Sequence, residues 1–286
     1  MTEYNQNPTI LTPAQLTNYQ EVGVIDSINI LSPQELAYYR AQIEKLNQAF
    51  DNTVVRMDGL HLFFDWAWDL ASHPKILDCM ERLTGPDILI ESTRLFYKHG
   101  NTGSYVGWHQ DGYTLQQTDN LAPAIWLGLT EATRENGCLR VIPGSHLHGP
   151  LSHVSHPGLS AVKEKHLNQR QQPLTSYNTS GDETSGRIAQ VPEGYHTPQD
   201  IVMQPGQMSL HHPLVLHGSE PNHTTEPRIG LSVSYTTPQL HNKRASIPYV
   251  RGQAPADYPE DIAPELSFDE AVAAYRISNR NMLFLP

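Results

Sequence analysis

This chain of 286 residues has little of several features that mark secreted and membrane-spanning proteins. Its two cysteines, Cys79 and Cys138, are too few for a disulfide framework, and we expect both to be buried thiols in a reducing compartment. Its apolar runs are all shorter than a membrane span, and residues 1–10 have neither the basic region nor the apolar core of a signal peptide. The sequence therefore predicts a cytoplasmic protein without a membrane segment.

Basic residues are also scarce. The chain has 19 Lys and Arg residues against 30 Asp and Glu residues, which gives a formal net charge of −11 with neutral histidines. The lysines and arginines form no dense run along the sequence. Because nucleic acids and anionic membranes attract positive charge, this balance argues against either of them as the main partner.

Helical patterns fill the first part of the chain, residues 1–86. Residues 13–22 have the pattern of a short helix. The segment Ser32-Pro33-Gln34-Glu35 is a capping box, and it predicts a longer helix that runs to about Phe50. A third helix is expected to begin at Pro74 and end at Gly85.

After residue 86 the pattern changes to short apolar or alternating runs separated by glycine, proline and asparagine. The predicted strands are residues 87–97, 124–130, 139–142, 201–203, 208–210, 214–216 and 229–236. Many short strands of this kind are typical of a sandwich or a jelly-roll barrel, with the preceding helices buttressing one sheet. We therefore expect a mainly β fold with flanking α-helices, built as a single domain over residues 1–286.

A long polar segment interrupts the predicted β core, which spans residues 87–238. Residues 147–198 are rich in Ser, His, Gln, Thr and Gly and contain few apolar pairs. A loop of this length inside a compact domain is either a lid or binding loop at a functional site or a surface insertion. We interpret it as a lid-like insertion, and residues 239–286 as a C-terminal extension.

The most informative pattern is a His-x-Asp step, His109 and Asp111, followed far along the chain by His217 and then, eleven positions later, by Arg228. Two imidazoles and one carboxylate from separate strands are the ligand set of non-haem Fe(II) oxygenases, which leave coordination positions open. A guanidinium beyond the second histidine can bind the far carboxylate of a 2-oxo acid in a bidentate contact. With 15 histidines and 30 acidic residues, about one or two His-x-acid steps are expected by chance, so the step needs its context.

That context consists of four further segments in a fixed order. They are Gly107-Trp108-His109-Gln110-Asp111-Gly112-Tyr113, then Glu135-Asn136-Gly137-Cys138-Leu139, then Pro143-Gly144-Ser145-His146, then Leu216-His217-Gly218-Ser219 with Pro221-Asn222. In this order and spacing the chain resembles the phytanoyl-CoA dioxygenase (PhyH-like) family of Fe(II)/2-oxoglutarate-dependent oxygenases. The resemblance runs from about residue 73 to Tyr235.

The resemblance implies a double-stranded β-helix, the cupin-like jelly roll, that binds Fe(II), 2-oxoglutarate and O2, with ascorbate as an aid in vitro. It implies that His109, Asp111 and His217 hold the metal. Further residues would then bind the cosubstrate: Arg228 and Ser219 at the distal carboxylate, Trp126 as a wall, and Lys98, which could instead be an exposed lysine at a strand end. Where the family often has a lysine ahead of the third helix, this chain has Arg56, Met57 and His61.

The implied reaction is the hydroxylation of an unactivated C–H bond, with release of succinate and CO2. The related halogenases lack the carboxylate that Asp111 provides, so its presence favours hydroxylation, desaturation or ring formation. We expect a small polar substrate, such as an intermediate of specialised metabolism, either free or bound to a carrier protein.

Three other interpretations stay open. An acyl-CoA substrate would need a basic cluster, for which the candidates are Lys163, Lys165, Arg170, Lys243, Arg244 and Arg251. A cupin-like metal protein without oxygen chemistry would need the metal residues but neither Arg228 nor Ser219. A structural or interaction protein would need none of them. His211 and His212 are rival metal ligands, and His146, His148, His153 and His156 form a second histidine group.

Overall fold

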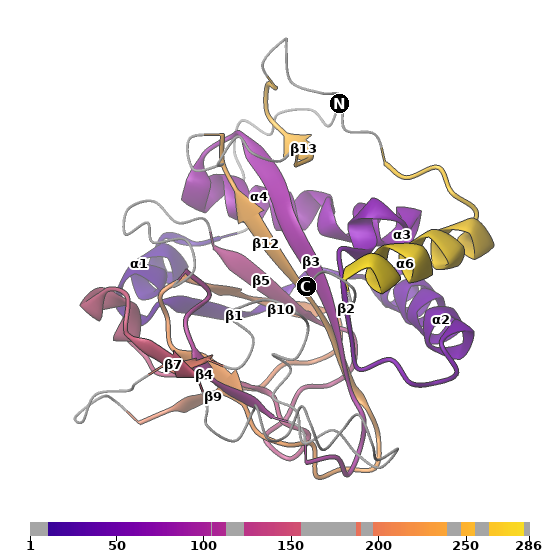
Figure 1. The fold of residues 1–286 in the computed structure, drawn as a ribbon. Helices are drawn as coiled ribbons and strands as arrows, with labels where there is room; N and C mark the ends of the chain where they lie inside the picture. Colours follow the sequence, from indigo (N-terminus) through magenta and orange to yellow (C-terminus); the bar gives the residue numbers. More distant parts are fainter. Residues whose placement is uncertain are drawn as a thin grey trace.

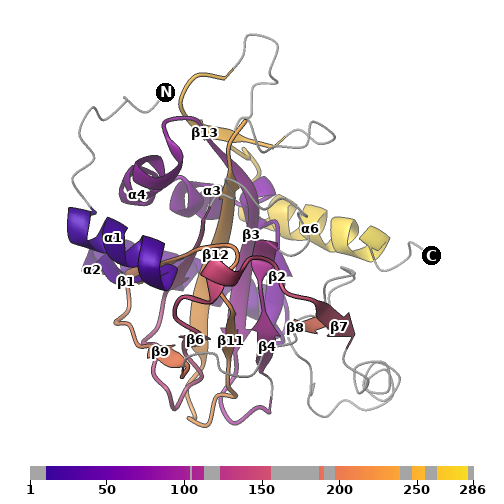
Figure 2. The ribbon, with the colours of Figure 1, turned by 90° about the vertical axis from the view of Figure 1, so that its left-hand side faces the viewer.

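The computed structural model describes residues 11–103, 105–112, 123–155, 187–189, 197–238, 247–254 and 263–282. Most of its strands form two antiparallel sheets of unequal size, and the helices lie beside the larger sheet (Figure 1). In Figures 1 and 2 the strands β4 and β9 of the smaller sheet lie away from the helices α3 and α4. This is the predicted mainly β jelly roll with flanking helices.

The larger sheet has seven strands and the smaller sheet four. The larger sheet has the order β1 (Val24–Asn29), β10 (Gln207–His211), β5 (Ala124–Gly128), β12 (Arg228–Thr236), β3 (Ile88–Lys98) and β13 (Tyr249–Arg251), and β2 (Arg56–Asp58) also pairs with β3. The smaller sheet has the order β4 (Val106–His109), β11 (His217–Ser219), β6 (Leu139–Val141) and β9 (Gln199–Ile201). A separate pair consists of β7 (His153–Ser155) and β8 (Arg187–Ala189).

The three predicted helices are confirmed to within one residue at each end. They are α1 (Pro13–Val22), α2 (Pro33–Ala49) and α4 (Pro74–Thr84), and the further helices are α3 (Asp65–Ala71), α6 (Phe268–Met282) and the short 3-10 helices η1 (Leu60–Leu62) and η3 (Ser145–His148). Thr12 and Ser32 each close a capping box, which satisfies backbone N–H groups at the starts of α1 and α2. None of the helices in the described ranges is long and apolar enough to cross a membrane.

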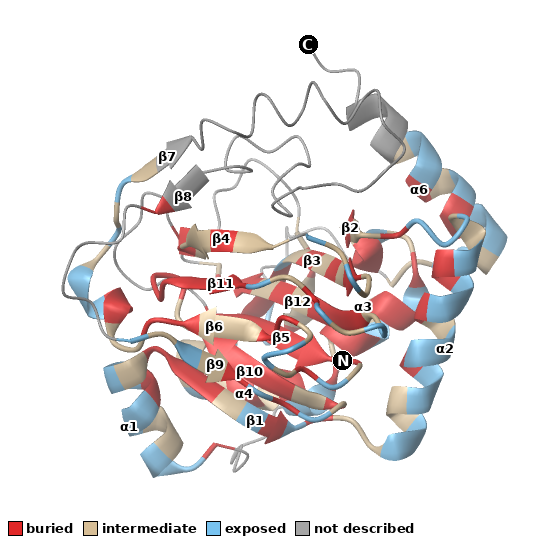
Figure 3. Cartoon of the chain, turned by 90° about the horizontal axis from the view of Figure 1, so that it is seen from below, coloured by how far each residue is buried: buried red, intermediate tan, exposed pale blue. Residues whose placement is uncertain are grey.

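The two faces of the larger sheet differ in character. The outer face is apolar, and Leu95, Ile125 and Leu231 pack there with buried residues of α2, α3, α4 and α6 into the main core. Figure 3 shows that the strands of the larger sheet are mostly buried, while the solvent sides of α1, α2 and α6 are exposed. The cysteines are confirmed as free, buried thiols. Because successive strand residues point to opposite faces, the residues between these apolar positions face the smaller sheet.

Those inner-face residues are polar, aromatic or glycine, and the strand register aligns them in rows. One row joins Ser209, Trp126, Ser232, Arg94 and Asp58 across five strands. The next row joins Gly128, Gly230, Phe96 and Arg56, and beyond it Arg228 pairs with Lys98. Residues paired directly across a sheet point to the same face. The larger sheet therefore presents a charged inner face to the metal motif of the smaller sheet.

Two sequence predictions about the fold are wrong. Residues 1–86 are not purely helical, because β1 and β2 come from this part and join the larger sheet. The run 214–216 is not a strand: it lies in the turn that leads to β11, and the backbone N–H of Val215 bonds to the His212 carbonyl. All three of its side chains are buried. A buried turn and a buried strand give the same apolar signal in the sequence, so the pattern could not separate them.

The predicted lid-like insertion, residues 147–198, lies mostly outside the described residues. Its described beginning is joined to the metal motif by Gln110, whose side chain is buried. The Gln110 amide donates to the carbonyls of Gly149 (3.0 Å) and Leu214 (2.7 Å), and its oxygen accepts from the Leu151 N–H (2.7 Å). The hydrogen bonds to Gly149 and Leu151 fix the segment after η3 to Gln110, which lies between His109 and Asp111 in the sequence.

Candidate active site

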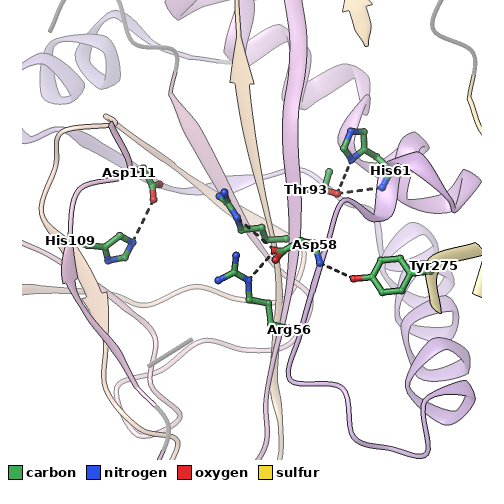
Figure 4. Close-up of polar contacts among 8 residues, drawn as sticks. Arg56, Asp58, His61, Thr93, His109, Asp111 and Tyr275 are labelled. Atoms are coloured by element: carbon green, nitrogen blue, oxygen red, sulfur yellow. Dashed lines mark hydrogen bonds and ion pairs between the residues drawn. The ribbon is translucent and has the colours of Figure 1, made fainter. Parts of the chain in front are cut away.

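Three side chains converge where β4 and β11 pair. His109 is the last residue of β4, Asp111 follows two residues later, and His217 begins β11 directly opposite His109. The Nε2 atoms of His109 and His217 lie 3.5 Å and 3.8 Å from the two carboxylate oxygens of Asp111. One donor atom from each residue fits within a 4.8 Å cluster. Figure 4 shows the ring of His109 turned toward Asp111.

The orientation of both imidazoles suits a divalent metal. The Nδ1 atom of His109 bonds to the Gly107 carbonyl at 2.9 Å, and that of His217 bonds to the Val215 carbonyl at 3.0 Å. Each Nδ1 must therefore carry a proton, which leaves the Nε2 lone pair facing the cluster. Two imidazole nitrogens and one carboxylate on one side of an ion are the donor set of non-haem Fe(II). The residues present fit this metal.

The ionisation of Asp111 and His217 agrees with that role, whereas burial of His109 is outweighed by its contact with Asp111, so the pKa of His109 is raised. Burial alone would raise the pKa of Asp111, but His217, His109 and the more distant Arg94 together hold it well below its usual range. Burial, followed by repulsion from His109, lowers the pKa of His217 to about 4. At neutral pH the cluster therefore has a carboxylate and an unprotonated His217, the forms that bind a metal.

The rival histidines have other contacts. The ring of His211 stacks on that of His217 with 6.0 Å between centroids, and its Nε2 bonds to Ser209 Oγ at 3.0 Å. His212 Nδ1 accepts from the Leu214 N–H, and His146 Nε2 bonds to the Gln20 carbonyl. Within the described ranges, His109, Asp111 and His217 form the one cluster with metal-binding geometry.

A second group of predicted residues lies at one end of the inner face. Arg228 and Lys98 are paired neighbours on β12 and β3, and both are buried. Lys98 Nζ donates to Ser219 Oγ at 2.8 Å and to the Glu220 carbonyl, so Lys98 and Ser219 lie side by side. The buried amide of Asn222 donates to the Lys98 carbonyl at 3.1 Å and fixes the strand end. The interpretation of Lys98 as an exposed lysine is wrong.

Trp126 lies beside this basic end. The guanidinium carbon of Arg228 is 5.0 Å from the centre of the Trp126 ring, a cation–π distance. The ring covers Gly230, where a Cβ atom would overlap it. The two sheets together bring Trp126, Arg228, Ser219 and Lys98 close to one another, and their binding of the cosubstrate stays a prediction.

Sequence reasoning missed the roles of Arg94 and Asp58. Asp58 Oδ1 accepts from Arg56 Nε at 2.9 Å, and Arg94 Nε lies 3.7 Å from the same oxygen (Figure 4). The backbone N–H of Asp58 donates to the Tyr275 hydroxyl at 3.0 Å, which fastens β2 to α6. The available signal was the even spacing of Arg94 and Lys98 on β3, which places both side chains on one face of the strand.

Residues 19–230 match the family model for phytanoyl-CoA dioxygenase (PhyH). The chain belongs to the PhyH family. As the resemblance implies, it is a member of a family of non-haem oxygenases that depend on Fe(II), 2-oxoglutarate and O2.

Two curated relatives illustrate the breadth of the PhyH family. The chain is 28% identical over 194 residues to a probable alpha-ketoglutarate-dependent hypophosphite dioxygenase of Stutzerimonas stutzeri, covering 68% of this chain and 61% of that protein. It is 25% identical over 242 residues to an ectoine dioxygenase of Nocardia farcinica (strain IFM 10152), covering 78% of this chain and 77% of that protein. These relatives are named for very different small molecules.

Among solved structures of this fold, the non-heme monooxygenase ThoJ in its apo form is similar. It has a TM-score of 0.70 at 27% identity, over 93% of this chain and 94% of ThoJ. The nickel complex of ThoJ matches with a TM-score of 0.65 at 25% identity, over 93% of this chain and 96% of ThoJ. The agreement extends over nearly the whole chain, which supports the predicted jelly roll.

In this PhyH-family protein, we expect the binding of 2-oxoglutarate to be coupled to the protonation of Lys98. Burial, and after it the repulsion of Arg228, lower the pKa of Lys98 to about 6, so it is mostly neutral at pH 7.5. A bound dianion would raise that pKa, and binding of 2-oxoglutarate should therefore take up as much as about one proton. We expect calorimetry of the Mn(II)-loaded protein at pH 7.5, in buffers of different ionisation enthalpy, to detect this uptake.

Two further outcomes follow from the same lowered pKa. Affinity for 2-oxoglutarate should fall as the pH rises above about 6, because neutral Lys98 must then be protonated on binding. The ligand-free protein should gain stability from pH 6 toward 10.5, since the unfolded state holds the lysine proton over that range. Lys98→Met should remove the proton uptake. Equal uptake in this variant and the wild type would contradict the assignment to Lys98.

Proposed function

We propose that this protein is an Fe(II)/2-oxoglutarate-dependent oxygenase that hydroxylates, or otherwise oxidises, an unactivated C–H bond of a small molecule, with release of succinate and CO2. His109, Asp111 and His217 hold the metal. Arg228, Ser219 and Lys98 bind the distal carboxylate of 2-oxoglutarate, and Trp126 forms a wall beside it. A small intermediate of specialised metabolism, free or carried on a protein, is the proposed substrate.

One observation supports this function above others: a His–Asp–His cluster and a buried basic group occur in the same jelly roll. Two cations buried as direct neighbours, Arg228 and Lys98, disfavour each other's charge. An anionic carboxylate beside them would offset both the burial and the repulsion. Ser219 Oγ accepts from Lys98, so its own O–H is available to donate to that carboxylate.

Iron and 2-oxoglutarate, when bound, would supply the activation of dioxygen that no side chain provides. The protein's own residues would bind, orient and shield. The imidazole N–H bonds to Gly107 and Val215 fix both rings, and Trp126 covers one side of the cosubstrate. Placement of the substrate at the metal then decides which bond reacts.

An acyl-CoA substrate receives less support from the described residues. Arg251, one of its candidate phosphate contacts, is buried and pairs with Asp78 at 2.6 Å and Glu81 at 2.9 Å. These ion pairs join β13 to α4. The charge of Arg251 is therefore already paired within the fold and does not serve a phosphate group. Lys163, Lys165, Arg170, Lys243 and Arg244 lie outside the described residues. Curated relatives are named both for small molecules such as ectoine and for phytanoyl-CoA, so the preference for a small substrate rests on the residues of this chain.

Thermal stability measures the proposed ligands directly, because a ligand that binds only the folded state raises the melting temperature. Mn(II) or Fe(II) should stabilise the protein, and 2-oxoglutarate should add a second increment to the metal-loaded form. Arg228→Ala should abolish the second increment and keep the first, because a charge-assisted pair is lost while the metal residues remain. If Arg228→Ala responds to 2-oxoglutarate like the wild type, the cosubstrate assignment is wrong.

The same measurement separates the other functional classes. A cupin-like metal protein without oxygen chemistry would show the metal increment alone, and a purely structural protein would show neither. Incubation with Fe(II), ascorbate, 2-oxoglutarate and a small-molecule extract of the host would then search for the substrate. The expected products are ions that gain one oxygen or lose two hydrogens while succinate forms.

A further inference from the structure

The inner face of the larger sheet carries a second basic group, separate from the cosubstrate end. Arg56 on β2 and Arg94 on β3 lie on either side of Asp58, whose partner across the ladder is Arg94. Arg94 lies four residues before Lys98 on the same strand, which places its Cα about 13 Å from that of Lys98. We call Arg56, Asp58 and Arg94 the second basic group.

This group has one more positive charge than negative charge, because two guanidiniums share one carboxylate. Arg56 takes the short contact at 2.9 Å, and the 3.7 Å between Arg94 Nε and Asp58 is too long for a hydrogen bond. The side chain of Arg94 makes no hydrogen bond to any other residue that the structure describes. Its side chain is 30% exposed, so its planar fork of donors remains accessible for an anion.

The second basic group lies near the metal cluster. Arg94 shares its row with Trp126 on the inner face of the larger sheet, the face that is turned toward the smaller sheet and its metal motif. Figure 4 shows Arg56 and Asp58 on the side of β2 that faces His109 and Asp111. The hydrogen bond between β2 and Tyr275 holds the second basic group in place. The Tyr275 ring in turn packs edge-on against Phe50 and Phe63.

We propose that Arg94, supported by Arg56 and Asp58, binds an anionic group of the substrate, a carboxylate or a phosphorus oxyanion, and so positions the reacting bond at the metal. This inference rests on the proposed function and narrows its substrate class to organic acids and related anions. Arg94 is then a specificity-determining residue, while Asp58 holds Arg56 and offsets part of the charge before substrate binds. The distal carboxylate of 2-oxoglutarate has its own basic residues at the far end of the strand.

The test uses the Mn(II)-loaded full chain at saturating 2-oxoglutarate, so that an acid competing only for the cosubstrate site gives no added stabilisation. The probes are small aliphatic and aromatic carboxylic acids, each compared with its primary amide, together with hypophosphite. The melting temperature is measured for the wild type, Arg94→Gln, Arg94→Lys and the control Arg134→Gln. Arg134 is an exposed arginine whose ion-pair partner is Asp200 of β9, outside the three-residue metal cluster.

We expect at least one anion to stabilise the wild type where its neutral analogue does not. In Arg94→Gln the same effect should need about a tenfold or higher concentration of that anion, because a charged contact is lost. Arg94→Lys should retain part of the response, and Arg134→Gln all of it. The proposal is overturned if acids and amides behave alike in the wild type, or if Arg94→Gln responds to acids as the wild type does.

A loss of the 2-oxoglutarate increment in Arg94→Gln would also overturn the proposal, since Arg94 would then bind the cosubstrate. Failure of the proposed function looks different. In that case the wild type itself would show no Mn(II) increment, or no 2-oxoglutarate increment that depends on Arg228, before any probe is added.

Discussion

Asp111→Ala should abolish the stabilisation of this protein by Mn(II) or Fe(II), and with it the turnover of 2-oxoglutarate to succinate. Asp111 contributes the only carboxylate in the three-residue metal cluster of the described chain, and both histidine Nε2 atoms face its oxygens. Removing it leaves two imidazoles, which bind Fe(II) poorly compared with the complete triad. The loss of metal affinity should exceed the roughly 10–100-fold that removal of a hydrogen bond to a metal ligand costs.

Asp200→Ala provides the matched control for Asp111→Ala. Asp200 is also a partly buried carboxylate near the end of a strand, but it pairs with Arg140 at 2.8 Å between β9 and β6. This control should lose some stability and keep the full metal increment. If the two alanine variants respond equally to metal, Asp111 does not hold the ion.

Asp111 also tests the choice between hydroxylation and halogenation once a substrate is available. The wild type should give an oxidised product free of chlorine in the presence of chloride, because the carboxylate fills the position that halide takes in the related halogenases. Product masses from Asp111→Gly with and without chloride provide the comparison. A chlorinated product from the unmodified protein would show that our interpretation of the carboxylate is incorrect.

Gly230→Ala should have the second large effect, lowering both stability and affinity for 2-oxoglutarate. A Cβ atom at this position would overlap the Trp126 ring. The ring therefore has to move, which changes its contact with Arg228, whose guanidinium lies 5.0 Å from the ring centre. Overpacking of this kind costs about 1–3 kcal/mol of stability. Chemical denaturation and titration of the metal-loaded variant with 2-oxoglutarate measure the two losses separately.

Gly128→Ala is the control for Gly230→Ala, because the two glycines are paired neighbours in one row of the sheet. At Gly128 the nearest atoms to a new Cβ are 3.3 Å away, so a shift of a few tenths of an ångström suffices. We expect a much smaller loss from this variant. A double variant, Gly230→Ala with Trp126→Leu, should regain stability but not cosubstrate affinity. Equal behaviour of the two glycine variants would indicate that Trp126 is free to move.

The relation between sequence and structure is clearest at the cosubstrate end. The sequence alone predicted Arg228, Ser219, Trp126 and Lys98, since a family motif preserves order and spacing. It could not decide whether Lys98 is exposed, because exposure depends on β11 and β12 lying beside the end of β3. The shifted pKa of Lys98 is likewise a property of that contact and not of the residue type.

The errors have an equally local cause. The turn at 214–216 contains three buried apolar residues, and hydrophobicity reports burial without reporting backbone direction. The strands β1 and β2 were missed because each is short and lies among helices, so only pairing with β10 and β3 stabilises them as strands. A short strand is stable only when it pairs with a neighbouring strand. The sequence of the short segment alone does not show which neighbour that is.

The sequence by itself determined the chemistry of this protein: the two histidines, the aspartate and the distant arginine are residue types at a spacing that chain order preserves. Only the tertiary structure decided which other charged side chains lie on the sheet face that is turned toward the metal residues. Arg56, Asp58 and Arg94 are separated by up to 38 positions, and they become neighbours only because β2 pairs with β3 in one register. Pairing register is set by packing of the whole sheet, so the proposed anion site emerged from the fold.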